Sequence, residues 1–348
     1  MSEFRVRIWV NMMRTDFWRS SKVAVVGGGS WGTVLAQLAS RNCREVRLWV
    51  RDENLARTIN STRVNKTYMP ELYLNENIHA FSALDRVFQD NVNVIIWALP
   101  SGVTRSQARA CAGFLRGDEL ILHATKGIEA GTMKRISEIL VDELPARRVG
   151  MVSGPNLAHE IAKGQPAATT VASAFNEVCE VGQWLLTQEN FRIYTANDIV
   201  GVEWAGALKN ILAIASGALE GMSLGWNTRA LFITRGLVEM VRFGNAMGAQ
   251  ESTFLTLAGI GDLLATCLSP LSRNYRVGFR IAGGEKLEKI LEDLGSVAEG
   301  VPTTYSVCEY ATLRGIPMPI TESVYQLLRG EVTASEALKK LMTRPSVS

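Results

Sequence analysis

Histidine and cysteine are scarce in this sequence, and their spacing matches no common metal-binding pattern. The chain holds three histidines and five cysteines among 348 residues, with no Cys-x-x-Cys and no paired His/Cys motif. An odd number of widely separated cysteines is typical of free thiols in a reducing compartment. We therefore expect no metal site and a cytoplasmic location. The five residues are Cys43, Cys111, Cys179, Cys267 and Cys308.

Strong charge and long apolar runs are also missing. The net charge is only +3, and no basic run is interleaved with aromatics, which argues against nucleic-acid binding. No stretch approaches the roughly 18 uncharged apolar residues that a membrane span needs. Residues 1–21 carry scattered arginines but no signal-peptide core, so we expect a poorly structured extension, with Met12 or Met13 as the true start.

Strands and helices alternate through the first half of the chain. Strands separated by helices predict a parallel sheet with right-handed crossovers, which is an α/β domain. The expected helices are Trp31–Ser40, Gly102–Phe114, Thr132–Leu140 and Glu177–Leu186. The expected strands are Lys22–Val26, Glu45–Val50, Asn93–Leu99, Glu119–Ala124, Arg148–Val152, Ala167–Ala172 and Phe191–Thr195.

Helical patterns dominate from about Asp198 onward. We place a domain boundary near residue 197, between an α/β domain of residues 22–197 and an all-α C-terminal domain of residues 198–348. The expected helices of the second domain are Gly201–Leu219, Thr228–Met247, Ser252–Ala265, Tyr275–Ile281, Lys286–Leu291, Thr303–Leu313, Ser323–Leu328 and Ala334–Met342.

A glycine-rich loop follows the first expected strand. Gly27, Gly29 and Gly32 form GxGxxG at the start of a helix. Such a loop lets the backbone approach a pyrophosphate, and the helix N-terminus adds free N–H groups and partial positive charge. Ser30 and Trp31 lie at the turn, so their N–H groups should face the phosphates. A glycine turn without a ligand is the alternative, but the strand before it and the second strand after it favour dinucleotide binding.

The second strand ends in the sequence LWVRDEN. An acidic residue at this position binds the ribose hydroxyls of NAD, whereas an arginine accommodates the 2′-phosphate of NADP. Arg51 comes first and favours NADP, while Asp52 keeps NAD open. A solvated loop position for Arg51 is the third interpretation.

Lys209 lies in the middle of an expected helix, GVEWAGALKNILAIASGALEG, that is apolar or small on nearly every side. No acidic residue stands three or four positions away, so an ion pair within the helix is excluded. Burial lowers the pKa of a lysine, which then serves as a general acid or base near neutral pH. Snorkelling to solvent is the alternative. Asn210 adds an amide beside it.

Three other segments place polar groups where a ligand could bind. Lys126 in ATKGIE follows a strand and stands at the carboxyl edge of the sheet, where open α/β folds bind ligands. Asp262 lies in the apolar segment LAGIGDLLATC and needs a partner, for which Lys209 is a candidate. Ser272, Arg273 and Asn274 form a hydroxyl, guanidinium and amide group suited to a phosphate. The alternatives are a surface turn position for Lys126 and a charge at a helix start for Arg273.

From about Lys22 to Leu328 the sequence resembles the bacterial NAD(P)-dependent glycerol-3-phosphate dehydrogenase family. The resemblance implies an N-terminal Rossmann domain and a helical C-terminal domain with the active site between them. A homodimer and a role in supplying glycerol 3-phosphate for phospholipids also follow from it. The matching segments, in the family's order, are GGGSWGTVLA, LWVRD, ALPS, ATKGIE, SGPNLAHE, GALKNILAIASG, NTRALFITRGL, AGIGDLLATC, SRN and VAEG.

The resemblance also implies roles for individual residues. Lys209 matches the catalytic lysine, and Asp262 would orient it. Asn156 departs from the hydroxyl residue usual at its position, which puts its substrate contact in doubt. The positions that match substrate contacts are Lys126, Gly154, Asn156, Lys209, Asp262, Ser272, Arg273 and Asn274. Those that match cofactor contacts are Ser30, Trp31, Arg51, Lys126, Ala158, Arg273, Val297 and Glu299, beside the loop glycines.

The reaction implied is the interconversion of sn-glycerol 3-phosphate and dihydroxyacetone phosphate by hydride transfer to or from NADP, the preferred cofactor, or NAD. Two alternatives remain. A related dehydrogenase acting on β-hydroxyacids would also use a lysine, although the Ser-Arg-Asn segment favours a phosphate over a carboxylate. A sensor that binds NAD(P) without chemistry has no use for a buried lysine.

Overall fold

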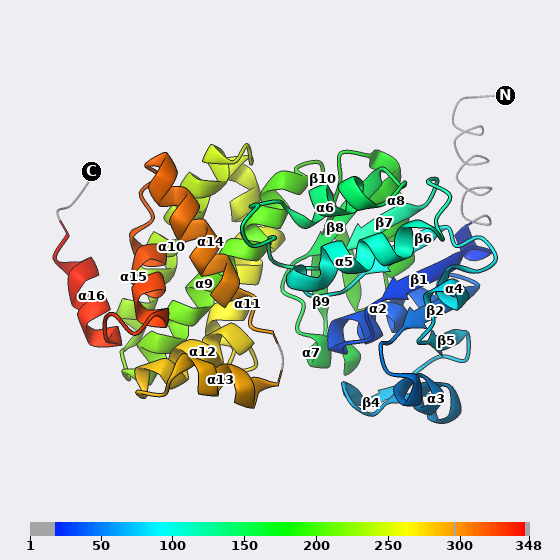
Figure 1. Cartoon of the computed structure of the whole chain (residues 1–348), viewed down its shortest axis with the longest axis horizontal. Helices are drawn as coiled ribbons and strands as arrows, with labels where there is room; N and C mark the ends of the chain where they lie inside the picture. The colour runs from blue at the N-terminus through cyan, green and yellow to red at the C-terminus, as the bar shows by residue number, and fades with distance from the viewer. Residues whose placement is uncertain (1–17, 296, 345–348) are drawn as a thin grey trace.

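The structure, a computed structural model, describes residues 18–295 and 297–344. The α/β domain and the helical domain lie next to each other along the long axis of the molecule (Figure 1). The expected start at Met12 or Met13 lies outside the described residues, as does most of the expected extension.

An eight-stranded sheet forms the first domain, in the order β10-β9-β8-β7-β6-β1-β2-β5. Neighbouring strands pair in parallel, as the alternation of strands and helices predicted, except β8 and β9, which are antiparallel. The strands are β1 (Lys22–Val26), β2 (Glu45–Trp49), β5 (Ile78–Phe81), β6 (Val94–Trp97), β7 (Leu120–His123), β8 (Arg148–Ser153), β9 (Ala167–Ala172) and β10 (Phe191–Ala196).

The antiparallel pair has a geometric cause. The chain between β8 and β9 contains only the five-residue helix α7 (Ala158–Ala162). At 1.5 Å per residue this helix is about 8 Å long, whereas a six-residue strand is about 20 Å long. The connection therefore turns the chain back without the full crossover that a parallel neighbour needs.

Helices cover both faces of the sheet, so the central strands are buried on both sides. In β1, Val23 and Val25 pack in one core with α2 and α8, while Ala24 and Val26 pack in another with α5 and α6. The helices of this domain are α2 (Ser30–Ser40), α3 (Glu53–Thr62), α4 (Leu84–Phe88), α5 (Ser101–Ala112), α6 (Ile136–Glu143) and α8 (Asn176–Leu186).

The segment between β2 and β6 was not predicted. It contains α3, α4, the strand β5 and a small antiparallel hairpin of β3 (Val64–Asn65) and β4 (Met69–Tyr73). Except for α3, these elements have five residues or fewer, too few to establish an apolar period. The end of β2 lies beside the glycine loop, where the N–H of Gly27 donates to the carbonyl oxygen of Trp49 at 3.3 Å.

The helical domain is built around α9 (Ile199–Gly221), which is buried along most of its length. This helix is long and apolar enough to cross a membrane, but 83% of its most apolar window is buried inside the protein. The apolar composition of α9 is therefore that of a core helix. Around it lie α10 (Trp226–Ala246), α11 (Asp262–Leu268), α12 (Arg273–Ala282), α13 (Leu287–Leu294), α14 (Gly300–Arg314), α15 (Pro319–Leu328) and α16 (Ala334–Met342).

Two glycines let α12 cross α9 with their backbones almost touching. A Cβ on Gly217 of α9 would lie 1.9 Å from the carbonyl oxygen of Tyr275, and one on Gly278 of α12 would lie 1.7 Å from that of Ile214. No side chain fits in either place. This crossing fixes the position of the segment that begins α12 relative to Lys209.

The prediction of one helix over Ser252–Ala265 was wrong. The segment forms a 3-10 helix (Glu251–Leu255) and a π-helix (Leu257–Gly261) before α11, and extended Thr256 separates the first two. A Cβ on Gly259 would lie 2.2 Å from the carbonyl oxygen of Phe254, so the tight winding needs glycine. π-Helical turns are frequent at functional sites, and this one delivers Asp262.

Candidate active site

The glycine loop has the geometry of a phosphate cradle. Gly27 has φ of +119°, and a Cβ there would lie 2.6 Å from the carbonyl oxygen of Ala98. A Cβ on Gly32 would lie 1.8 Å from the carbonyl oxygen of Gly27. The N-cap of α2 is Gly29, and no side chain caps the helix, so the N–H groups of its first turn, from Ser30 and Trp31, suit an anion.

Arg51 is exposed two residues after the end of β2. Its neighbour Asp52 caps α3, because its Oδ1 accepts a hydrogen bond of 2.7 Å from the N–H of Leu55. The carboxylate that would favour NAD is therefore already engaged by the helix, whereas the Arg51 side chain is open to a 2′-phosphate.

Two lysines from different domains share one carboxylate. Lys209 on α9 is only 4% exposed, and its Nζ donates to Asp262 Oδ1 and, at 2.7 Å, to Thr266 Oγ1. Lys126, after β7, donates from Nζ to Asp262 Oδ2 at 2.6 Å and to the carbonyl oxygen of Gly154 at 2.9 Å. The structure thus brings together four of the predicted site residues where the sheet edge meets α9 and α11. With Thr266, we call Lys209, Lys126, Asp262 and Gly154 the lysine cluster.

The electrostatics of this cluster set the protonation of Lys209. Burial and, to a lesser extent, the charge of Lys126 lower its pKa to about 7, against the opposing effect of Asp262. Burial by itself would raise the pKa of Asp262, but Lys126 and Lys209 outweigh it and hold the pKa below its usual value. The carboxylate therefore stays ionised while Lys209 exchanges its proton near neutral pH.

A row of amides connects the rest of the site. Asn210 donates from Nδ2 to the carbonyl oxygen of Lys126 at 3.0 Å, and Asn274 donates to Asn210 Oδ1 at 2.9 Å. Asn274 Oδ1 in turn accepts from the N–H of Gly300 at 2.9 Å. Buried Asn274 is thereby fixed beside the lysine cluster, at the first turn of α12.

The residues before Asn274 occupy the N-terminus of α12. Ser272 is the N-cap, and its Oγ accepts a 3.3 Å hydrogen bond from the N–H of Tyr275. Arg273 follows as the first helical residue and is exposed. A hydroxyl, a guanidinium and the positive end of a helix together form a setting suited to a phosphate.

Glu299 joins the two domains. Its carboxylate accepts from the backbone N–H of Ser101 at 2.9 Å and from the Ser101 hydroxyl, at the N-terminus of α5. Burial raises the pKa of Glu299, although these hydrogen bonds and Arg273 act in the opposite direction. Val297 is exposed two residues earlier, in the connection between α13 and α14.

The remaining predicted residues lie in the segment after β8. Asn156 donates from Nδ2 to Thr169 Oγ1 at 2.8 Å, while its buried Oδ1 has no hydrogen-bond partner among the described residues. Ala158 begins α7 and packs against the core of the first domain. Neither side chain is hydrogen-bonded to the lysine cluster in the described chain.

One member of the cluster, Thr266, has no direct signal in the sequence. Its hydroxyl accepts from Lys209 Nζ and lies 2.7 Å from the carbonyl oxygen of Asp262, four residues earlier in the chain. The spacing of four places Asp262 and Thr266 on one helix face. That spacing could have identified Thr266 once Asp262 was chosen.

Comparisons with known proteins match both domains of the chain. Two family models match, described as NAD-dependent glycerol-3-phosphate dehydrogenase N-terminus, over residues 22–179, and C-terminus, over residues 198–339. Glycerol-3-phosphate dehydrogenase [NAD(P)+] of Leuconostoc mesenteroides is 42% identical over 331 residues, which cover 93% of this chain and 98% of the relative. The enzyme of the same name from Enterococcus faecalis is 42% identical over 326 residues, 93% of this chain and 96% of the relative.

The fold agrees as well. The crystal structure of glycerol-3-phosphate dehydrogenase from Coxiella burnetii superposes with a TM-score of 0.87 at 33% identity, and the match covers 93% of this chain and 99% of that one. The expected architecture, an α/β Rossmann-type domain followed by an all-α domain, is therefore confirmed. On sequence and structure together, the chain belongs to the NAD-dependent glycerol-3-phosphate dehydrogenase family.

Proposed function

We propose that this protein is an NAD(P)-dependent oxidoreductase that interconverts sn-glycerol 3-phosphate and dihydroxyacetone phosphate. The activity is the one named for relatives that are 42% identical over 93% of the chain. The observation that carries the proposal is the amine of Lys209, buried between two domains and held by Asp262 with a pKa of about 7. A lysine of that pKa suits proton transfer in both directions.

Lys209 is the proton donor and acceptor in this proposal. In the reducing direction the oxygen at substrate C2 gains negative charge, and the ammonium of Lys209 stabilises that charge and gives up its proton. In the oxidising direction the neutral amine takes the proton back. Asp262 holds the amine in place, and Thr266 fixes its second donor direction. Lys126 adds a second positive charge next to Asp262.

The substrate phosphate is assigned to the N-terminus of α12. Ser272, Arg273 and Asn274 offer a hydroxyl, a guanidinium and an amide there, and Asn274 is tied through Asn210 to the lysine cluster. Holding the phosphate at this point would orient C2 toward Lys209. Gly154 and Asn156 complete the proposed substrate contacts, and the buried Oδ1 of Asn156 has no hydrogen-bond partner among the described residues.

The cofactor is assigned to the loop of Gly27, Gly29 and Gly32. The bound nicotinamide ring would donate or accept the hydride. Ser30 and Trp31 would bind its pyrophosphate, and exposed Arg51 would bind a 2′-phosphate, which makes NADP the preferred form. The other residues proposed to line the cofactor are Lys126, Ala158, Arg273, Val297 and Glu299.

In the cell, we propose that the enzyme works in the cytoplasm and supplies glycerol 3-phosphate for phospholipid synthesis. The described cysteines are all free, which fits a reducing compartment. We also propose a homodimer. Large apolar side chains are exposed on the helical domain, among them Trp226 at 75% and Leu255 at 65%, and a contact between two copies would cover such residues. Light scattering of the purified chain tests the dimer.

The proposed activity is tested by following NADPH and NADH oxidation by the purified chain with dihydroxyacetone phosphate. A β-ketoacid without a phosphate serves as the comparison substrate. We expect turnover with the phosphate ester, faster with NADPH at low cofactor concentration. Turnover with the ketoacid alone would contradict the substrate assignment, and tight cofactor binding without oxidation of any substrate would favour a sensor.

A further inference from the structure

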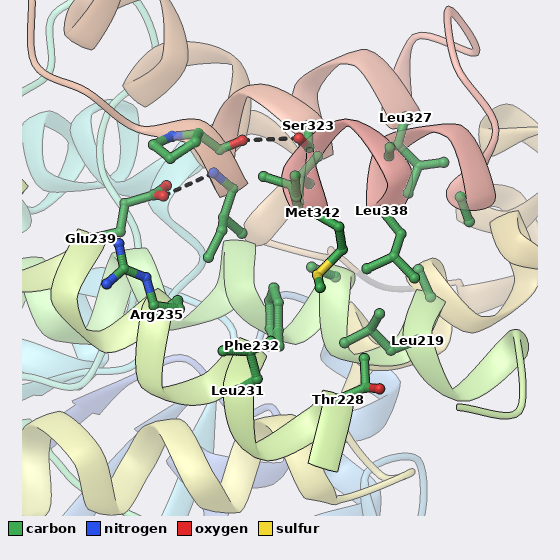
Figure 2. Close-up of a pocket in the computed structure, with 18 of the residues that line it drawn as sticks. Leu219, Thr228, Leu231, Phe232, Arg235, Glu239, Ser323, Leu327, Leu338 and Met342 are labelled. Atoms are coloured by element: carbon green, nitrogen blue, oxygen red, sulfur yellow. Dashed lines mark hydrogen bonds between the residues drawn. The ribbon is translucent and has the colours of Figure 1, made fainter. Parts of the chain in front are cut away.

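A pocket of about 620 Å³ lies within the helical domain and does not belong to the candidate active site (Figure 2). It is lined by residues of α9, α10, α15 and α16 and is partly open to solvent. The contribution of α9 includes Ala218, nine residues after Lys209. Nine residues are two and a half helical turns, so Ala218 and Lys209 lie on opposite sides of α9. The pocket therefore opens behind the helix that carries the proposed catalytic lysine.

The walls of the pocket are mainly aliphatic and aromatic. Phe232 of α10, Leu327 of α15, and Leu338 and Met342 of the last helix line it (Figure 2). Protein interiors are normally packed to crystal density, with few voids larger than a water molecule. An apolar space of several hundred Å³ is in the range of small-molecule binding sites.

The charged residues that α10 contributes lie toward one end of the pocket, and Arg344, which also lines it, is paired with Glu322. Along α10, Thr228, Leu231 and Phe232 are followed by Arg235, Glu239 and Arg242, whose spacing of four and three residues keeps them on one face. The distance from Thr228 to Arg242 is about 21 Å at 1.5 Å per residue. In Figure 2, Arg235 and Glu239 lie on one side, whereas Leu219 and Leu327 lie on the other.

The charged end has surplus positive charge. The Glu239 carboxylate is already used, because it accepts from the N–H groups of Ile320 and Thr321 at 2.8 Å and from the Thr321 hydroxyl at 2.7 Å. Burial also raises the pKa of Glu239, although its hydrogen bonds and Arg242 act in the opposite direction. Arg242 donates to the carbonyl oxygen of Pro317, and Arg235 forms no ion pair with the described residues.

The lining and the charge of the pocket together indicate the kind of occupant. A single hydrocarbon chain would cover the apolar walls, and a terminal anion would meet Arg235 and Arg242. We propose that this pocket binds a single-chain anionic amphiphile, a fatty carboxylate or an alkyl phosphate, with its head at Arg235 and Arg242.

The test is titration calorimetry of the full chain with dodecanoate, dodecyl phosphate and the cationic dodecyltrimethylammonium, all below their micellar concentrations. We expect saturable binding of at least one anion at one site per chain and at least tenfold weaker binding of the cation. Binding of the carboxylate, the phosphate or both identifies the head group.

Two variants and one control locate the site. Leu338→Trp fills the apolar part and should abolish binding. Arg235→Gln removes an exposed charge without touching the core and should weaken anion binding about fivefold to tenfold. Arg44→Gln changes an exposed arginine on the other domain and should have no effect. If Leu338→Trp does not fold, the comparison of anion affinity between Arg235→Gln and Arg44→Gln tests the proposed site.

Three results would overturn the proposal. They are absence of saturable heat with either anion, equal binding of the cation, and anion binding unchanged by Arg235→Gln. A chain that binds no amphiphile, and whose mass in solution halves in Leu338→Trp, would show instead that a second copy covers this face.

Discussion

Asp262 controls the protonation of Lys209, and replacing it with asparagine isolates that effect. The amide keeps the size of the side chain and removes its charge. In the wild-type protein the Asp262 carboxylate raises the pKa of Lys209, while burial and Lys126 lower it to about 7. Without the carboxylate, only the lowering influences remain, so the pKa of Lys209 should fall below 7.

The size of this shift in the pKa of Lys209 can be bounded from the geometry. Asp262 contacts Lys209 directly, and two unit charges about 4 Å apart interact by about 4 kcal/mol at an effective dielectric constant of 20. We take a conservative shift of at least one pKa unit, which is about 1.4 kcal/mol. At pH 7 the ammonium fraction would then fall from about one half to about one tenth. Reduction of dihydroxyacetone phosphate, which needs the ammonium, should slow about fivefold from this effect alone.

The assay is kcat/KM for reduction as a function of pH, followed by NADPH absorbance. Lysine is charged below its pKa, so the wild-type rate should fall as the pH rises through about 7, and oxidation of glycerol 3-phosphate should rise over the same range. Asp262→Asn should shift the midpoints of both pH profiles, for reduction and for oxidation, to lower pH. Asp293→Asn, which removes an exposed partner of Arg280, is the control. Midpoints that stay at the wild-type pH, or shift to higher pH, would refute the reasoning.

Three further substitutions test other parts of the site and fold. Arg273→Ala should raise KM for dihydroxyacetone phosphate about tenfold or more by removing a charged phosphate contact, and an unchanged KM in initial-rate kinetics would exclude that contact. Arg51→Ala should raise KM for NADPH about tenfold and that for NADH less than twofold; equal losses would remove Arg51 as the reader of the 2′-phosphate. Gly278→Ala should lower the free energy of unfolding by about 3 kcal/mol or more, because its Cβ would lie 1.7 Å from the Ile214 carbonyl oxygen. In denaturant titrations Gly102→Ala, with open space around its Cβ, should be neutral or slightly stabilising, and similar losses in both would contradict the close crossing.

Much of the fold was predictable because its signals are local. The buried strands on either side of the glycine loop are short apolar runs, and the loop itself is marked by glycines at fixed spacing. The antiparallel placement of β9 could not be predicted in this way, since it depends on how far the connection through α7 can reach. The division of the segment before Asp262 into a 3-10 helix and a π-helix was also not predicted, because apolar periodicity does not distinguish a π-turn from a regular helix.

The site residues also divide into those with a local signal in the sequence and those whose role depends on tertiary structure. Lys209 was recognisable because a charged residue in an apolar helix is costly, and Asp262 because a carboxylate in an apolar segment needs a partner. Which effect dominates the pKa of Lys209 could not be read from the sequence, since it depends on burial and on the distances to Asp262 and Lys126. Thr266 was missed because a threonine in a helix is ordinary until its hydroxyl is seen to accept from Lys209.

The central claim is that the buried amine of Lys209 moves the proton during the reaction. The most direct measurement compares kcat for dihydroxyacetone phosphate reduction in the wild-type chain and in Lys209→Ala, together with NADPH affinity by fluorescence titration. The account predicts a loss of at least about a thousandfold in kcat with NADPH affinity within about twofold, since general acid catalysis and charge stabilisation are both removed. A Lys209→Ala variant that turns over at a rate close to wild type would contradict it.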